Sequence, residues 1–380
     1  MKINLLLKNG MVIDPSLGMM KRASVAICGR KIVRYQEGDE IDQEIDASEC
    51  IVTPGLIDFH THVFPLSTDF GIWADSTFLP QGVTSVVDAG SAGVINFENF
   101  LKSSVSFNQM RVFGLVNVSP FGISTLKFHE EVNPKYYDEQ KIFELNEKYP
   151  GKIIGLKCRQ SEDVVGRHGL NPLKETVKIA DKLKLPVVVH TTQPYGSMDS
   201  LADLLRPGDV LCHCFHGKGN TIIDNNGSIT PGILNAKKRG VVFDTADGKS
   251  HFSFSVANSA FKNNFFPDVI SSDLTTLSLY KSYSFALPFN LSKYLNLGLE
   301  LSEAIASCTS RPAKFLGMAG QIGTLTPGAI ADISVFRLIK NRTRFTDALG
   351  VHFFGEQLLL PQLTVLDGRI VFRQLNFDTV

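Results

Sequence analysis

The sequence predicts an α/β fold: an eight-stranded (β/α)8 TIM barrel with a small β-sandwich domain that both chain ends build together. Three observations predict it. Apolar, β-branched segments recur eight times through the middle of the chain, and most of them alternate with helix-like segments. Strands that alternate with helices indicate a parallel sheet, and eight such units within about 220 residues fit a closed barrel. Both chain ends, in contrast, are rich in short strands and turns.

The chain ends carry hairpin signals. Asn9-Gly10 separates two apolar runs, Gly29 interrupts a second pair, and Asp367-Gly368 is the same kind of turn near the end. Neither end has a long helical pattern. We therefore expect residues 1–50 and 325–380 to pair as one composite β-sandwich domain, and residues 51–324 to form the barrel domain.

The barrel elements follow in chain order. A helix is predicted over 171–184, where Asn171 and Pro172 are typical of a helix start. A later helix over 300–317 is interrupted by a proline. The predicted strands cover residues 56–62, 82–90, 111–119, 152–160, 185–192, 208–215, 240–247 and 268–275.

The composition is that of an ordinary folded protein, because 43% of the 380 residues are apolar and 20% are charged. Lys plus Arg and Asp plus Glu each total 38, so the charge predicts neither a nucleic-acid partner nor an anionic membrane surface. The sequence has no run of 18 apolar residues and no signal-peptide pattern. Six cysteines without framework spacing favour reduced thiols and a cytoplasmic protein. We expect a small-molecule substrate, and homo-oligomerisation stays open.

The stretch "TPGLIDFHTHVFP" holds two of only nine histidines, His60 and His62. Side chains two apart on a strand point to the same face, so both rings can reach one ion, at about 2.0–2.1 Å if that ion is zinc. Taken alone the pair is a weak signal, since two surface histidines at the start of a loop would give the same pattern.

Further ligand-capable residues stand near the carboxyl ends of the other predicted strands. These are Lys157 on strand four, His190 on five, His213 on six and Asp273 on eight. A barrel brings its strand ends around one opening, and that end carries the catalytic residues of TIM-barrel enzymes. The combined set therefore indicates a metal site.

Lys157 interrupts the apolar run "KIIGLKCRQ". It could be a snorkelling or salt-bridged lysine. Burial disfavours the charged ammonium, however, and a neutral amine can react with carbon dioxide to form a carbamate. That group is a carboxylate on a long stem and could bridge two divalent ions.

Together these residues resemble the amidohydrolase superfamily of metal-dependent hydrolases, over nearly the whole chain. The tail "IGTLTPGAIADISVF" is also similar to the return of that superfamily into its small β-domain. The resemblance implies that His60, His62 and Asp273 bind one metal and that His190 and His213 bind the other. Carboxylated Lys157 and a hydroxide would bridge the two ions. Zinc is favoured by the imidazole-rich set, while manganese, iron and cobalt stay possible.

A narrower resemblance is to the dihydroorotase-like amidohydrolase/deacetylase branch. Its matching pieces are "GLKCRQS", "GDVLCHCFHGKGNTIID", "RGVVFD" and "PDVISSDL". That branch usually has Gly-His-Gly after strand seven, where this chain has Ala246-Asp247-Gly248. A group of the pocket is therefore changed, and the substrate of the branch does not carry over.

The expected reaction is attack of the metal-bridging hydroxide on an amide or ester carbonyl of a small, carboxylate-bearing, acetylated substrate. Asp273 would pass the water proton to the leaving group, or act as a plain ligand, and both roles can coexist. Arg159, two residues after Lys157, would clamp the substrate carboxylate. Pairing of Arg159 with a nearby acid such as Glu162 is an equally good interpretation.

Three alternatives remain. A cyclic-amide hydrolase resembling dihydroorotase would carry an arginine two positions after the histidine pair, where this chain has Phe64. Purine deaminases of the superfamily mostly use one metal and lack the bridging lysine. A scaffold relative without catalysis would usually lose ligands.

Among other polar residues, we expect Cys158, Cys212 and Cys214 to face the helix layer, and His216, His251, Lys218 and Asn220 to lie in solvated loops.

Overall fold

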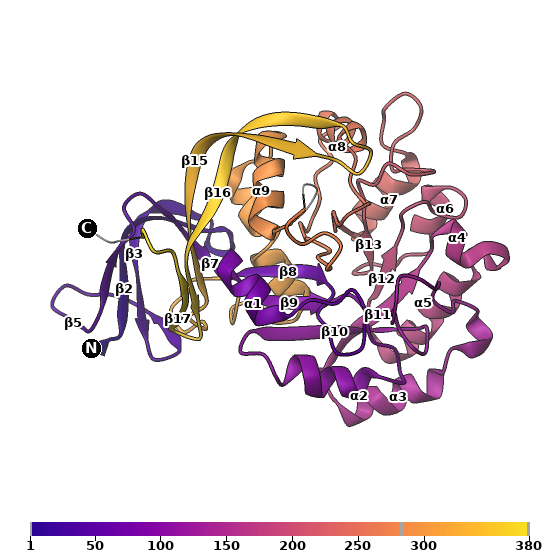
Figure 1. The fold of residues 1–380 in the computed structure, drawn as a ribbon, viewed down its shortest axis with the longest axis horizontal. Coiled ribbons are helices and arrows are strands. Elements are labelled where there is room, and N and C mark those ends of the chain that lie inside the picture. Colours follow the sequence, from indigo (N-terminus) through magenta and orange to yellow (C-terminus); the bar gives the residue numbers. More distant parts are fainter. Residues whose placement is uncertain (1, 282–284, 378–380) are drawn as a thin grey trace.

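The computed structural model describes residues 2–281 and 285–377. Within them, a curled parallel sheet of seven strands forms the centre, in the order β14-β13-β12-β11-β10-β9-β8 (Figure 1). Strands that follow each other along the chain are therefore neighbours, as repeated β-α units require. Its strands are β8 (Leu56–Thr61), β9 (Val83–Asp88), β10 (Arg111–Asn117), β11 (Ile153–Arg159), β12 (Val187–His190), β13 (Val210–Cys212) and β14 (Val242–Asp244).

The eighth predicted strand, 268–275, differs from the other seven. It makes single parallel bridges, between Val269 and Asp244 of β14 and between Leu274 and Thr61 of β8. The segment thus lies between the two outer strands without forming a regular strand. The physical reason is local: Asp273 has a φ of 50°, and a left-handed residue interrupts an extended backbone.

Helices cover the outer face of this sheet (Figure 1). The predicted helix over 171–184 is α5 (Asn171–Leu183), with Pro172 in its first turn and Leu173 and Ala180 buried. The predicted helix over 300–317 is two short ones, α10 (Leu301–Ala306) and α11 (Ser310–Phe315), separated by a turn before Pro312. The others are α1 (Ala74–Phe78), α2 (Phe97–Phe100), α3 (Glu139–Lys148), α4 (Glu162–Val165), α6 (Met198–Ala202), α7 (Pro231–Arg239), α8 (Phe254–Lys262) and α9 (Leu287–Asn296), with one-turn elements η1 (Pro15–Leu17), η2 (Leu79–Gln81), η3 (Leu101–Val105), η4 (Pro134–Tyr136) and η5 (Gly166–His168). Among the described residues, none of these helices combines the length and the apolar character needed to cross a membrane.

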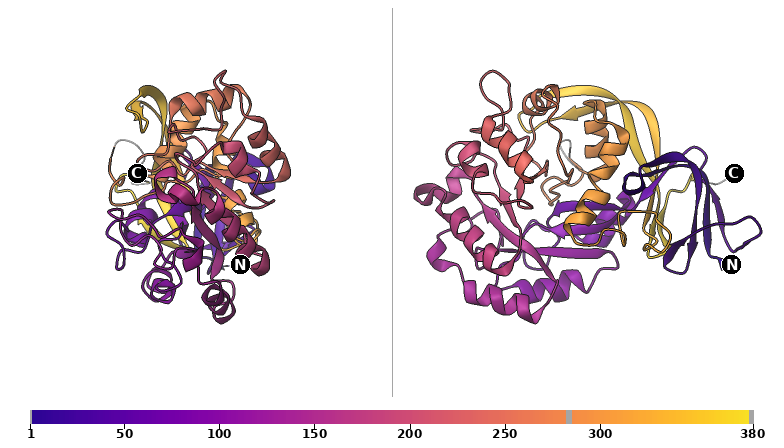
Figure 2. Two further views of the ribbon diagram at one scale, coloured as in Figure 1. Left: turned by 90° about the vertical axis from the view of Figure 1, so that its right-hand side faces the viewer. Right: turned by 180° about the vertical axis from the view of Figure 1, so that it is seen from behind.

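Strands from both chain ends share a second, mixed sheet in the order β17-β16-β15-β7-β2-β3-β4. This sheet stands to one side of the parallel sheet and its helices (Figure 2). The join is made by β7, which lies just past the predicted boundary at residue 51 and pairs with β2 and β15. The division into two domains stays a prediction. The strands are β2 (Leu5–Asp14), β3 (Met19–Cys28), β4 (Lys31–Val33), β7 (Ile51–Pro54), β15 (Ile333–Thr346), β16 (His352–Leu366) and β17 (Arg369–Arg373), with β6 (Glu44–Asp46) beside β2 and a separate pair β1 (Lys2–Ile3) and β5 (Glu40–Ile41).

Two features of the packing position the functional face. Apolar side chains fill the inside of the curled sheet, among them Phe59, Leu115 and Val188, so the interior is a core rather than a channel. The long β15–β16 hairpin arches over α9 toward α8, where Phe353 packs edge-on against Phe254 at 4.9 Å (Figure 1). Beyond this apolar core, polar side chains gather at the carboxyl ends of the parallel strands.

Candidate metal centre

The sequence-predicted ligands come together at the carboxyl ends of the parallel strands. His60 is near the end of β8 and His62 directly after it, Lys157 is in β11, and His190 ends β12. His213 follows β13, and Asp273 belongs to the irregular eighth segment. These residues, which span most of the chain, are all buried: His60, His62, Lys157, His190, His213 and Asp273.

One half of the centre is formed by His60, His62 and Asp273, each of which offers a ligand atom within 4.8 Å of the other two. Asp273 Oδ1 lies 3.3 Å from His62 Nε2 and 3.7 Å from His60 Nε2. We call this group the β8 half. A carboxylate and two imidazoles in this spacing are a donor set that suits a divalent ion.

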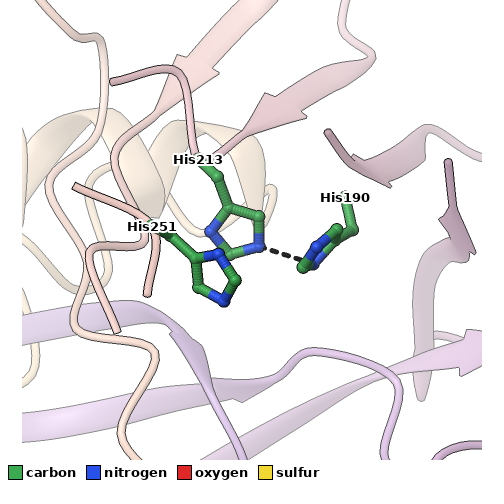
Figure 3. Close-up of side chains that lie close together, drawn as sticks. All are labelled: His190, His213 and His251. Carbon is green, nitrogen blue, oxygen red and sulfur yellow. Dashed lines mark hydrogen bonds between the residues drawn. The ribbon is translucent and has the colours of Figure 1, made fainter. Parts of the chain in front are cut away.

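The other half consists of His190, His213 and His251, again with ligand atoms within 4.8 Å of one another. Figure 3 shows the three rings turned toward a common space, with His213 Nε2 2.8 Å from His190 Nδ1. We call this group the β12 half. The two halves adjoin, because the rings of His60 and His213 lie 5.1 Å apart and His251 Nε2 is 3.6 Å from Asp273 Oδ2.

The outer nitrogen of several rings is held by a neighbour. His213 Nδ1 donates to the carbonyl oxygen of Ala246 at 2.7 Å, which leaves its Nε2 as a lone pair facing the centre. His62 Nδ1 contacts Ser91 Oγ at 2.8 Å, and its Nε2 faces Asp273. Metal-binding histidines are typically oriented by such partners on the other nitrogen.

The residues fit a metal on two further grounds. Burial lowers the pKa of His60, of His190 and of His213 well below the ordinary value, so these rings are neutral and able to donate a lone pair to a cation. The buried Nε2 of His190 also has no hydrogen-bond partner among the described residues. His190 Nδ1 donates to His213 Nε2 at 2.8 Å, so the Nε2 of His190 keeps a lone pair that a cation would stabilise.

Local backbone strain marks the same face. His213, Ala246 and Asp273 have φ values of 62°, 40° and 50°, although none of them is glycine. Such conformations cost roughly 1–3 kcal/mol each and persist where surrounding contacts enforce them. Here they turn strand ends six, seven and eight toward the centre.

The side chain of Lys157 extends from β11 to the β8 half. It is 3% exposed, and its Nζ lies 3.4 Å from His60 Nε2. Its aliphatic stem packs so closely on Gly90 that a Cβ at that glycine would approach within 2.5 Å. Lys157 therefore lies beside His60.

Two buried carboxyl groups contact residues of the β8 half or the segment next to it. Asp244 Oδ2 lies 3.3 Å from His60 Nδ1, and Asp58 accepts the backbone N–H of Ser272. Burial raises the pKa of Asp58 and of Asp244 to about 7. These carboxyls hold the ring of His60 and the segment that carries Asp273.

The prediction that Cys212 faces the helix layer is wrong. Cys212 belongs to the core inside the curled sheet and, with His60 and Asp244, forms a third group of ligand-type atoms within 4.8 Å. The cause is the left-handed backbone of His213, which ends the strand alternation and lets neighbouring residues both point inward. Cys158 and Cys214 do pack in the core between sheet and helices, as predicted.

Two histidines assigned to solvated loops are in fact buried or nearly so. The side chain of His251 is only 18% exposed, and its ring lies 4.1 Å from that of His213. His216 is fully buried, and burial lowers its pKa to about 3. No periodicity in the loops around them signals this. The one available clue was composition, because three of the nine histidines follow strands six and seven.

The stretch Ala246-Asp247-Gly248 keeps contact with the centre despite its unusual residues. Gly248 lies against Asp273, since a Cβ there would stand 2.3 Å from Oδ2. The carboxylate of Asp247 accepts from Lys293 Nζ at 2.6 Å and from the Tyr294 hydroxyl at 2.7 Å. Asp247 is thus bound to α9 and braces the loop that carries His251.

Arg159 ends β11 beside a cavity of about 350 Å³ whose wall also includes His190 and His251. Its Nη1 lies 3.5 Å from Glu130 Oε1, and its Nε donates to Ser161 Oγ at 3.2 Å. The acid beside Arg159 is therefore Glu130, which the sequence did not single out, and not Glu162. A larger cavity, of about 800 Å³, opens at the amino ends of β12 to β14, away from the histidines.

Phe64 occupies the position two residues after the histidine pair and is fully buried. Its ring packs edge-on against Phe100 at 5.4 Å, within the core between sheet and helices. Phe64 therefore offers no polar group to a substrate.

Fold and site together define an α/β protein with a candidate metal centre at the carboxyl ends of its parallel strands. A family model described as the amidohydrolase family matches residues 51–371. A deacetylase of Agrobacterium fabrum is 30% identical over 330 residues, covering 87% of this chain and 81% of that protein. Two crystal structures are similar as well. An adenine deaminase has 28% identity and a TM-score of 0.90, covering 98% of this chain and 100% of that one. A dihydroorotase has 27% identity and a TM-score of 0.86, covering 99% of each chain.

The chain therefore belongs to the amidohydrolase family, and it is a hydrolase.

Proposed function

We propose that this protein is a binuclear metal-dependent deacetylase that acts on the amide or ester carbonyl of a small acetylated acid. The observation that carries the proposal is the pair of adjoining ligand groups, the β8 half and the β12 half. The similarity to a deacetylase over most of the chain supports the choice of an acetyl group.

The proposed ligands follow from the two halves. His60, His62 and Asp273 would hold one ion, His190 and His213 the other, and a carbamate on Lys157 would bridge them. Zinc is the proposed ion, because neutral imidazoles and a carboxylate suit it. When bound, such ions supply a nucleophile from water at neutral pH and polarise the scissile carbonyl.

Asp273 is the proposed proton carrier. Its carboxylate stands between the halves, with Oδ1 toward His62 and Oδ2 toward His251. Its backbone N–H donates to the carbonyl oxygen of His60 at 2.7 Å, which holds the residue in place. From this position Asp273 can take the proton of the attacking water and hand it to the leaving nitrogen or oxygen.

Arg159 is the proposed contact for the carboxylate of the substrate. Its guanidinium lines the cavity next to His190, and its Nη2 group has no hydrogen-bond partner within the described part of the chain. A planar guanidinium binds a carboxylate through two parallel hydrogen bonds.

The test is a screen of N-acetyl and O-acetyl acids in both enantiomers, with zinc and bicarbonate supplied, together with metal analysis. The expected result is acetate release and about two ions per chain. Absence of bound metal after loading would favour the scaffold alternative, and metal binding without acetate release would exclude the deacetylase.

A cyclic-amide hydrolase is the second candidate, favoured by the similarity to a dihydroorotase structure. The burial of Phe64 speaks against it, because the carboxylate-binding arginine of such enzymes would stand there. Dihydroorotate, and adenine in view of the deaminase structure, belong in the same screen.

The finer architecture is part of the proposal. The bridges of Val269 and Leu274 to the two outer strands support a closed (β/α)8 barrel, and the shared mixed sheet supports a composite domain from both chain ends. A cytoplasmic location and a small-molecule substrate complete the proposal.

A further inference from the structure

Glu130 is a buried carboxylate in the wall of the candidate substrate cavity that the proposed reaction does not use. Its side chain is 4% exposed, and it reaches the cavity from the long segment between β10 and η4. Burying a carboxylate is unfavourable unless hydrogen bonds or an opposite charge compensate. Its partners therefore indicate what the cavity is built to bind.

The carboxylate of Glu130 is held from behind. Asn117, the last residue of β10, donates from Nδ2 to Glu130 Oε2 at 2.9 Å and to the carbonyl oxygen of Gly90 at 3.2 Å. Asn117 Oδ1 in turn accepts the backbone N–H of Ser119 at 2.9 Å. Because Asn117 at the end of β10 holds its carboxylate, Glu130 has a fixed position in the cavity wall.

The other oxygen of Glu130 faces Arg159, but the pair is loose. The distance from Oε1 to Arg159 Nη1 is 3.5 Å, longer than the 2.7–2.9 Å of a strong charged hydrogen bond. The Arg159 side chain is 24% exposed, and its Nη2 engages no other described residue. Both charges thus keep hydrogen-bonding capacity for a ligand.

We propose that Glu130 and Arg159 form a paired subsite for a zwitterion, so that the substrate is an acetylated α-amino acid whose amino group is free. Arg159 binds the α-carboxylate and Glu130 binds the α-ammonium. The proposal rests on the proposed deacetylase function and names its substrate class. A buried carboxylate beside the guanidinium would repel a ligand with negative charge alone, whereas two opposite charges on one carbon atom match both groups.

The acetyl group then belongs on the side chain of the amino acid, as in O-acetylserine. Hydrolysis breaks the acyl C–O bond, and water supplies a hydroxyl to the acetyl carbon and a proton to the serine oxygen. The products are acetate and serine.

The experiment compares three esters that differ only in charge: O-acetylserine in both enantiomers, 3-acetoxypropanoate, which lacks the ammonium, and 2-acetoxyethylammonium, which lacks the carboxylate. We expect the zinc-loaded wild-type enzyme to favour one enantiomer of O-acetylserine over each single-charge ester by about tenfold or more in kcat/KM.

Two variants give opposite expected changes. Glu130→Gln keeps the Asn117 hydrogen bond through its amide oxygen, and it should lower kcat/KM for O-acetylserine about tenfold while raising that for 3-acetoxypropanoate. Arg159→Met should abolish the preference for the carboxylate and spare 2-acetoxyethylammonium. Glu162→Gln is the matched control, because Glu162 is exposed and outside the cavity wall, and it should change nothing.

Calorimetric titration with serine, 3-hydroxypropanoate and ethanolamine separates this proposal from the deacetylase function. Tighter binding of serine that Glu130→Gln removes would support the subsite even if no ester is hydrolysed, and the function alone would then fail. Equal or better binding and turnover of the carboxylate lacking an ammonium would overturn the zwitterion subsite and leave the deacetylase intact.

Discussion

The two halves of the candidate metal centre are built in different ways. In the β8 half, His60 and His62 stand on one strand end, and strand alternation alone turns both rings to one side. In the β12 half, His190 ends a strand, His213 sits at a left-handed position, and His251 comes from a loop. A strand-borne pair is set by local periodicity, whereas the second triad depends on contacts that hold loops in place.

The most severe test of this comparison removes one ligand from each half. We expect His62→Ala and His213→Ala each to lower kcat/KM about a thousandfold or more, because metal ions contribute several kcal/mol to such reactions. Each variant should retain about one ion per chain by elemental analysis. His352→Ala, at an exposed position, is the control. Loss of both ions from either variant would mean that the halves do not bind separately.

The next test weakens the support of the β12 half without touching a proposed ligand. Lys293→Met leaves Asp247 buried without its cation, and removing one partner of a buried ion pair costs about 3–5 kcal/mol of unfolding free energy. Urea unfolding at neutral pH measures the loss. The double variant Asp247→Asn, Lys293→Met should recover most of it, because the amide oxygen can still accept from Tyr294. An unchanged stability of the single variant would contradict the bracing role of this pair.

His251→Ala examines whether the third histidine belongs to the β12 half. We expect a loss of about 10–100-fold in zinc affinity or kcat/KM, the size typical of residues that support a metal site. Chelator competition and steady-state kinetics measure the two quantities. If both stay at wild-type values, His251 is only a neighbour of the centre.

The smallest effect concerns His216, next to the same half. Its pKa is lowered from 6.5 to about 3 by burial, so below pH 6.5 the unfolded chain takes up a proton that the folded chain does not. Stability should therefore fall as the pH drops from about 6.5 toward 3, by up to about 1.4 kcal/mol per pH unit for this residue. In urea unfolding of the metal-free protein at pH 7 and pH 5, His216→Gln should lose less stability than wild type between the two conditions. Parallel losses would show that His216 does not contribute.

Much of the centre was predictable because its signals are local. His60 and His62 share a face by alternation. Lys157 interrupts the apolar run that forms β11, His190 ends β12 and His213 directly follows β13. The parts that escaped prediction depend on backbone turns. The φ of 62° at His213 turns its ring to the same side as Cys212, against the expected alternation, and the hydrogen bonds of Asp247 to α9 hold the loop that places His251 beside His213.

The wall of the candidate substrate cavity likewise contains one predictable residue and one that was not predictable. Arg159 was predictable by its spacing from Lys157, but its partner Glu130 lies 29 residues earlier and was not. Periodicity specifies the face of a strand to which a residue belongs. The amino-acid order alone therefore predicted the parallel strands, most of the candidate ligands and the family resemblance. It contains no comparable rule for long loops. Their course depends on packing and hydrogen bonds between distant segments, which is why Glu130, His251 and the irregular eighth strand became evident only in the folded chain.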